Sequence, residues 1–317
     1  GGAGVQGTRR AGTGVVSAES VTRAQVLRQL ELAVTRRLDG LLHGDHRGLV
    51  PGAGTEPGEG REYRSGDDVR RMDWNLTART GVAHVRETIA DRELETWIVV
   101  DQSASLNFGT AACEKRDLAL AAAASFAFLT ARAGNRVGAV TLGPDGPAVL
   151  PARTGRDAAL ALLHRLDAAP RTADRAGPAS DPAGDLARTL AVADRAARRR
   201  GLVAVVSDFL DRSAWPARLR GLGVRHQVIA VEVRDPREDD LPPVGYLTLV
   251  DPETGRRLEV QTQKGSLRRR FAEAAVAQRE AVRAHIVGAG AAHLVLSTDR
   301  DWLGDLVRFV EAGRKRR

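Results

Sequence analysis

One carboxylate and two hydroxyls follow a short apolar run in the sequence. Residues 97–100 are Trp, Ile, Val and Val, and Asp101, Ser103 and Ser105 come directly after them. Such a run is typical of a central parallel strand that is buried on both faces. In an open α/β sheet, ligands bind at the loops that follow the carboxyl ends of the strands. Three hard oxygen ligands there would suit Mg²⁺ or Mn²⁺ better than zinc.

A second aspartate stands at the end of another apolar run. Residues 202–207 predict a strand, and Asp208 follows it. If the two strands are neighbours, their carboxyl ends bring Asp101 and Asp208 to one edge of the sheet, where both carboxylates can hold a metal ion. The structural alternative is that the serines or Asp208 only cap the helix that follows.

Strand-like and helix-like segments alternate along most of the chain. Strands are expected at 96–100, 135–142, 202–207, 227–233 and 293–297, and helices at 113–132, 156–168, 185–199, 213–221, 265–287 and 301–313. Two hairpins are expected, one pairing 147–150 with the second strand and one pairing 246–250 with 257–261. The alternation predicts an α/β fold with a doubly wound, mostly parallel, Rossmann-like sheet.

The domain organisation follows from composition. Residues 1–20 are rich in Gly, Thr and Ser and are expected to be disordered. Residues 21–93 form an N-terminal irregular or β extension, with a helix at 21–38, a short helix at 69–74 and a strand at 82–91. Residues 94–313 form the main domain, with a hairpin insertion at about 240–262. Residues 44–61 are glycine-rich and are expected to form a loop or an irregular hairpin region.

Charge and cysteine content narrow the class of protein. The chain carries 48 basic and 40 acidic residues, and its aromatic content of 4% offers little for stacking on bases, so no nucleic-acid partner is expected. Cys113 is the single cysteine, which favours the cytoplasm. The longest apolar stretch, 118–131, is too short to span a bilayer, so no integral membrane segment is expected.

A dense polar stretch covers residues 61–79. Its carboxylates, Asp67, Asp68 and Asp73, alternate with arginines, and Trp74 lies among them. One interpretation is a partly buried ion-pair network, anchored by Trp74, that clamps the N-terminal segment onto the main domain. A second is a metal-dependent hydrolase that uses these aspartates, or Asp101 and Asp208, as acid, base or metal ligands. A third is a surface that docks a partner.

The Asp-x-Ser-x-Ser sequence, with a later strand that ends in Ser-Asp, resembles the von Willebrand factor A fold and its metal-ion-dependent adhesion site. The resemblance covers roughly residues 94–235. It implies a Mg²⁺ or Mn²⁺ site whose coordination is completed by a partner's acidic residue. The ligands that it implies are Asp101, Ser103, Ser105 and Asp208.

One ligand of that family is missing from the pattern. The family tends to place a threonine of the second loop at the metal, and this chain has Gly184 at the corresponding position. Thr172 or Ser180 of the same loop could take its place, or water could. The resemblance therefore implies a four-ligand site that binds metal more weakly.

The polar stretch has a resemblance of its own. It is similar to the signature of the bacterial domain-of-unknown-function family number fifty-eight, whose members carry a von Willebrand A-like domain after it and are commonly encoded beside MoxR-type AAA+ ATPases. The matching residues are Tyr63, Gly66, Asp67, Asp68, Arg70, Asp73, Trp74, Ala78 and Arg79. This resemblance implies a non-enzymatic protein-interaction module that works with a MoxR-type AAA+ ATPase and its client, in chaperone-like assembly or maturation of other proteins.

Overall fold

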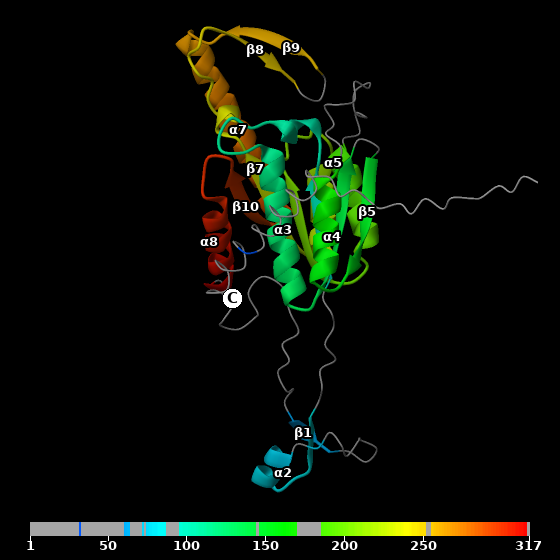
Figure 1. Cartoon of the computed structure of the whole chain (residues 1–317). Coiled ribbons are helices and arrows are strands. Elements are labelled where there is room, and N and C mark those ends of the chain that lie inside the picture. Colours follow the sequence, from blue (N-terminus) through cyan, green and yellow to red (C-terminus); the bar gives the residue numbers. More distant parts are fainter. Residues whose placement is uncertain are drawn as a thin grey trace, which may run out of the picture.

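The structure is a computed structural model, and it describes Leu32, residues 60–63, Met72 and residues 74–86, 95–143, 146–169, 185–251 and 255–315. Its centre is a six-stranded sheet with the order β10-β7-β6-β3-β4-β5 (Figure 1). The strands are β3 (Glu95–Asp101), β4 (Arg136–Gly143), β5 (Gly146–Arg153), β6 (Gly201–Ser207), β7 (Gln227–Arg234) and β10 (Ala292–Ser297). All neighbours run parallel except β5, which returns antiparallel to β4.

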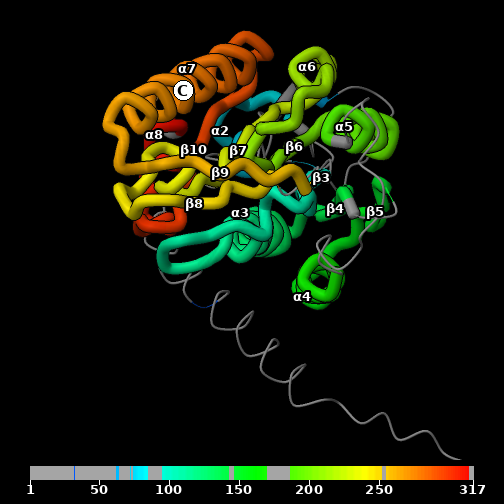
Figure 2. The backbone as a smooth tube through the Cα atoms, turned by 90° about the horizontal axis from the view of Figure 1, so that it is seen from above, coloured from blue at the N-terminus to red at the C-terminus, as the bar shows by residue number. Residues whose placement is uncertain are grey.

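Helices cover both faces of this sheet (Figure 2). One face packs against α3 (Lys115–Arg132), α4 (Arg156–Asp167) and α8 (Trp302–Lys315). The other packs against α5 (Asp185–Ala196), α6 (Trp215–Arg225) and α7 (Gly265–Gly288). The predicted doubly wound, mostly parallel α/β fold is therefore confirmed.

Strand β3 is the central element. All seven of its residues are buried, because helices cover the sheet on both sides. Ile98 and Val100 face the α3 side, whereas Trp97 and Val99 face the α5 side. The chain runs from β3 to β4 and β5 on one side and later returns to β6 on the other. The carboxyl ends of β3 and β6 therefore form a topological switch point, which is where open α/β sheets bind ligands.

Close backbone contact between β3 and β6 depends on one glycine. A Cβ atom placed on Gly201 would lie 2.0 Å from the carbonyl oxygen of Glu95, its partner in the parallel ladder. No side chain fits in that space, so the first pair of the β3–β6 ladder requires glycine.

Both predicted hairpins are confirmed, the first by the antiparallel pairing of β5 with β4. Strand β8 (Tyr246–Val250) pairs antiparallel with β9 (Arg257–Gln261). The hairpin lies at the end of the molecule where the parallel strands terminate (Figures 1 and 2). None of the helices in the described ranges combines the length and the apolar composition needed to cross a membrane.

The N-terminal extension differs from the sequence prediction at one helix end. Helix α2 (Trp74–Thr80) starts at the residue where the predicted helix was expected to end, so that end is wrong. Residues 60 and 61, the end of the stretch expected to be a loop or an irregular hairpin region, belong to β1 (Gly60–Glu62), which pairs with β2 (His84–Arg86). This pairing joins segments more than twenty residues apart, which a local pattern does not reveal. Residues 1–20 and the helix at 21–38, apart from Leu32, lie outside the described residues.

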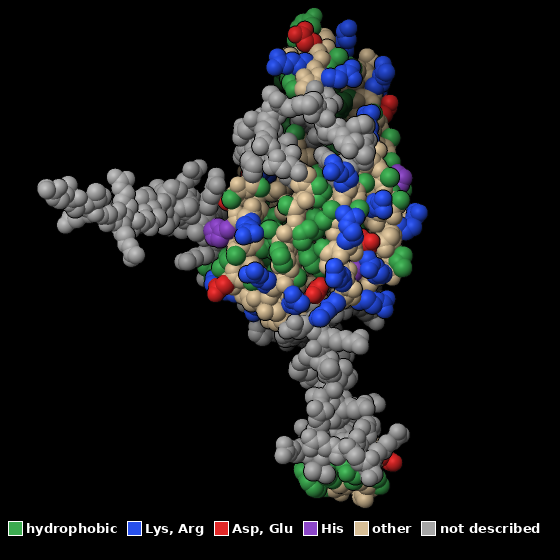
Figure 3. Space-filling view, turned by 90° about the vertical axis from the view of Figure 1, so that its right-hand side faces the viewer, with side chains coloured by type: hydrophobic (Ala, Val, Ile, Leu, Met, Phe, Trp, Pro, Cys, Tyr) green, Lys and Arg blue, Asp and Glu red, His purple; other side chains and the backbone are tan. Residues whose placement is uncertain are grey.

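The surface on the β5 side carries scattered positive charge. Figure 3 shows Lys and Arg side chains interspersed with hydrophobic ones and with a few Asp and Glu. Arg153 of β5 and Arg156 and Arg165 of α4 are exposed. The charge is thus mixed with apolar surface over these elements.

Candidate functional site

The two predicted strand ends meet. Strand β3 pairs with β6 up to Val100 and Val206, so Asp101 and Ser207 follow side by side. The Ser207 hydroxyl donates to Oδ2 of Asp101 over 2.6 Å. The expectation that these strands are neighbours, with Asp101 and Asp208 at one edge of the sheet, is confirmed.

The loop after β3 folds back on the aspartate. The backbone N–H of Ser103 donates to Oδ1 of Asp101 over 2.8 Å, and the hydroxyls of Ser103 and Ser105 lie 3.0 Å apart, within hydrogen-bond distance. Ser103 precedes a short 3₁₀ helix, residues 104–107, but its hydroxyl makes no capping hydrogen bond there. The three oxygen-bearing side chains are thus gathered in one loop, and the simple capping interpretation does not account for Ser103.

Burial makes Asp101 hard to ionise. Its side chain is 4% exposed, and desolvation together with the nearby negative charge of Asp208 raises the pKa of Asp101 to about 6. Hydrogen bonds from Ser207 and Ser103 stabilise the ionised form and limit the rise. Burial and the neighbouring carboxylate therefore both disfavour the charged form of Asp101.

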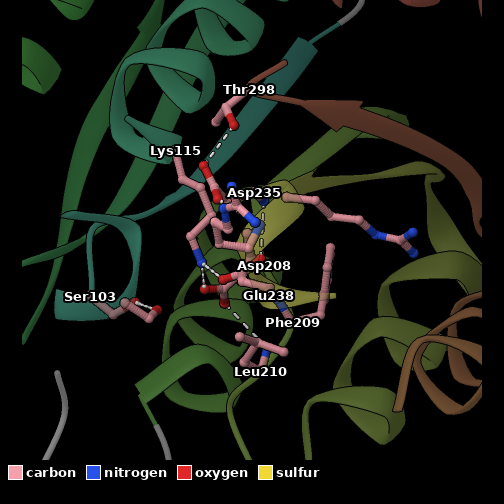
Figure 4. Close-up of polar contacts among 12 residues, drawn as sticks. Ser103, Lys115, Asp208, Phe209, Leu210, Asp235, Glu238 and Thr298 are labelled. Carbon is pink, nitrogen blue, oxygen red and sulfur yellow. Dashed lines mark hydrogen bonds and ion pairs between the residues drawn. The ribbon is translucent and has the colours of Figure 1, made fainter. Parts of the chain in front are cut away.

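A lysine provides the cation nearest to Asp208. Lys115, at the start of α3, is 1% exposed, and its Nζ lies 2.8 Å from Oδ2 of Asp208 and 2.5 Å from Oε1 of Glu238 (Figure 4). Burial alone would lower the pKa of Lys115, but the charges of Asp208 and Glu238 raise it above its ordinary value. The lysine is therefore a charged ammonium held between two carboxylates.

Glu238 is itself fixed by the loop after β7. Its Oε2 accepts a hydrogen bond from the backbone N–H of Asp235. The Asp235 carboxylate accepts one from the backbone N–H of Arg237. Asp235 is fully buried, and it also accepts hydrogen bonds from Thr110 and from Thr298, which follows β10 (Figure 4). Burial acts to raise the pKa of Asp235, but these hydrogen bonds outweigh it and hold that pKa below its ordinary value.

The backbone after Asp208 adopts an uncommon conformation. Phe209 has φ of 55°, the one positive φ at a non-glycine residue among those that the structure describes. Its ring is buried against Trp215, with centroids 5.0 Å apart. The turn brings the N–H of Leu210 to 3.2 Å from Oδ1 of Asp208. This strained turn, which packing of the Phe209 ring stabilises, fixes the direction of the Asp208 carboxylate.

The donor set agrees in kind with a divalent metal but is already engaged by other groups. Carboxylate and hydroxyl oxygens are the ligands that Mg²⁺ prefers, and a cation would relieve the repulsion between Asp101 and Asp208. Against this, Lys115 holds one oxygen of Asp208. Gly184, Thr172 and Ser180 lie outside the described residues. Within the described ranges, no cluster of three or more His, Cys, Asp and Glu could hold a metal, so a carboxylate-rich hydrolase centre has no support there.

Few residues of the polar signature are described. The backbone N–H of Tyr63 donates to Ala83 O over 2.7 Å, and the Trp74 side chain is 68% exposed. Ala78 and Arg79 lie in α2, Arg79 in its last turn. The remaining members lie outside the described residues: Gly66, Asp67, Asp68, Arg70 and Asp73. The predicted ion-pair network and the hydrolase alternative built on these aspartates stay predictions.

Several residues of the site escape the sequence pattern. Asp235 follows β7 and Glu238 lies in the short 3₁₀ helix after it, and their one local signal is the Asp-Pro-Arg-Glu sequence at 235–238, a capping-box pattern. Lys115 is one of only three lysines among 48 basic residues, but nothing in the sequence indicated its role. Its partners lie 93 and 123 residues away, which no spacing rule reveals.

Comparison with known families gives a clear assignment. The profile of the family described as "Protein of unknown function DUF58" matches residues 59–281. The chain belongs to the DUF58 family. It is 52% identical to the uncharacterized protein Rv1480 of Mycobacterium tuberculosis over 292 residues, 92% of this chain and 90% of that protein. It is 42% identical to the uncharacterized protein MAV169 of Mycobacterium avium over 166 residues, 52% of this DUF58 chain and 94% of that protein.

Solved structures include von Willebrand factor A domains among those similar to this DUF58 protein. The conserved hypothetical protein BatB from Bacteroides thetaiotaomicron has 12% identity and a TM-score of 0.44, covering 70% of this chain and 99% of that one. The SpRpn10 VWA domain has 13% identity and a TM-score of 0.37, covering 68% and 93%. These similarities concern the chain path alone and carry nothing about function.

Proposed function

We propose that this DUF58 protein is a non-enzymatic protein-interaction module that binds its partner at the carboxyl end of the β3–β6 pair. The observation that carries the proposal is the convergence of Asp101, Ser103 and Ser105 with Asp208 at the switch point of the sheet. A Mg²⁺ or Mn²⁺ ion held by these four residues would offer a coordination position to a carboxylate of the partner.

The proposed partner is a MoxR-type AAA+ ATPase together with its client protein, in chaperone-like assembly or maturation. Support comes from the signature residues that resemble the family, of which Tyr63, Trp74, Ala78 and Arg79 are described. Trp74 is a large exposed aromatic side chain, the kind of residue that is enriched at protein interfaces. The signature thus supplies a second surface in addition to the sheet edge.

Binding to the MoxR-type ATPase of the same genome tests this proposal. The full chain is immobilised, and binding is measured with Mg²⁺, with EDTA and for Asp101→Ala. We expect saturable binding with Mg²⁺ that weakens about tenfold or more in EDTA, which removes the metal, and in the variant, which removes one of its ligands. Asp157→Ala, an exposed carboxylate in the first turn of α4, is the matched control and should bind normally.

Two outcomes count against the proposal. Binding that is equal with Mg²⁺, with EDTA and in Asp101→Ala would remove the metal-mediated contact. An ATPase that fails to bind under all conditions would remove it as the partner.

A further inference from the structure

A positive charge already occupies part of the site. Lys115 is 1% exposed, and its ammonium lies 2.8 Å from Oδ2 of Asp208, one of the four residues that would hold the metal. An ammonium and a divalent cation that share one carboxylate repel each other strongly, because the site is buried and poorly screened. Both cations therefore cannot occupy Asp208 in this arrangement.

The lysine has a second carboxylate to which it can remain bound. Glu238 lies 2.5 Å from Nζ, and its other oxygen is fixed by the backbone N–H of Asp235. The Glu238 side chain is 23% exposed, whereas Asp208 is 4% exposed. An ammonium that leaves Asp208 therefore keeps a charged partner and reaches a wetter position, which makes its release from Asp208 feasible.

We propose that Lys115 is a tethered cation that competes with the divalent metal for Asp208. With Lys115 on both carboxylates, the site is closed to metal, and metal binds when the ammonium moves to Glu238 alone. This inference rests on the metal site of the proposed function and adds a control to it. The position of one side chain at the start of α3 then sets the metal affinity.

Metal binding to the isolated chain tests the competition. Mn²⁺ affinity is measured by calorimetry and by electron paramagnetic resonance for the wild type, for Lys115→Met and for Lys264→Met. Lys264 is an exposed lysine that precedes α7, so its variant controls for the loss of one positive charge. We expect Lys115→Met to bind Mn²⁺ about tenfold or more tightly than the wild type, and Lys264→Met to match the wild type.

A second variant covers the case in which Lys115→Met does not fold. Lys115→Met/Glu238→Gln removes the ammonium together with one of its carboxylates, so fewer buried charges stay unpaired. The same increase in Mn²⁺ affinity is expected. Equal affinity in the wild type and in the folded variant would overturn the competition.

The wild type offers a direct readout of the lysine itself. The chain has three lysines, so the ¹⁵N signal of the Lys115 ammonium can be assigned by comparison with Lys115→Met. Saturating Mg²⁺ should shift this signal as the ammonium leaves Asp208. A signal that stays unchanged while metal binds would overturn the inference.

The metal and partner measurements separate the two proposals. The metal measurements use no partner, so an ATPase that fails to bind leaves the competition intact. If neither the wild type nor the variants bind millimolar Mn²⁺, a range that covers weak protein sites, the competition and the metal-mediated contact both fail. Binding of the ATPase would then stand as a metal-independent interaction.

Discussion

Ser207 joins the ends of two strands by a single hydrogen bond to Asp101. The two residues are 106 positions apart, and the hydroxyl donates to Oδ2 of the carboxylate over 2.6 Å. The same hydroxyl accepts a hydrogen bond from the N–H of Phe209 over 3.0 Å. Ser207 therefore connects the Asp101 loop to the strained turn that follows Asp208.

We expect Ser207→Ala to lower the free energy of unfolding by about 1–3 kcal/mol, because a buried carboxylate and a buried N–H each lose a partner. Urea denaturation followed by fluorescence measures this change. Ser297→Ala is the matched control, since that serine also ends a strand but bonds the exposed Asp299. Its effect should stay within about 0.5 kcal/mol. Equal losses in the two variants would contradict the role given to Ser207.

The sequence predicted those parts of the fold and the site that depend on short residue patterns occurring more than once in the chain. Two apolar runs that each end in aspartate were enough to predict that Asp101 and Asp208 share an edge, because parallel strands end at a common edge. The contacts of Lys115 were not predictable, since they depend on how α3 packs relative to the ends of β6 and β7. The predicted helix end at Trp74 was wrong, because contacts of Thr77 and Thr80 with His84, together with the pairing of β1 with β2, define that region.

Gly201 should tolerate no side chain. Gly201→Ala would place Cβ 2.0 Å from the Glu95 carbonyl, so the central β3–β6 pair must separate. We expect a loss of about 3 kcal/mol or more, or failure to fold, because the contact is with backbone that cannot turn away. Thermal unfolding and soluble yield measure the effect.

A matched glycine lies in α6. A Cβ at Gly221 meets nothing within 4 Å, so Gly221→Ala should be neutral or stabilise the protein by up to about 1 kcal/mol, as alanine favours helix. A stable Gly201→Ala protein would show that the ladder can shift.

His226 should make stability depend on pH. It is 6% exposed, and burial together with the charge of Arg225 lowers its pKa below the ordinary value of 6.5. The unfolded chain takes up the proton at higher pH, so this contribution is complete above 6.5 and is lost as pH falls toward the folded pKa. We expect His226→Gln to flatten the decline in urea midpoint between about pH 7.5 and about pH 5.

The control for that measurement is His164→Gln, which changes an exposed histidine of α4. It should leave the pH profile of the wild type unchanged. A profile that His226→Gln does not alter would assign the pH dependence to other groups.

Positive charge alone should not make this protein a DNA-binding protein. The Lys and Arg side chains on the β5 side are mixed with apolar ones (Figure 3), and the aromatic content is 4%. We expect no saturable binding of labelled duplex DNA by fluorescence anisotropy at about 0.15 M salt, where counterion release contributes little for scattered charges. Tight binding with a steep dependence on salt would contradict this prediction.

The order of strands in the sheet has a consequence for how the protein folds. β4 and β5 follow each other in the chain, whereas β3 meets β6 only after about a hundred residues have intervened. Closing so long a loop slows the formation of contacts, so the β3–β4–β5 half is expected to assemble before β6 docks. Asp208 and Ser207 arrive with β6, and Glu238 arrives later in the chain. A partly folded molecule therefore has no site, and any partner that binds there selects chains whose folding is complete.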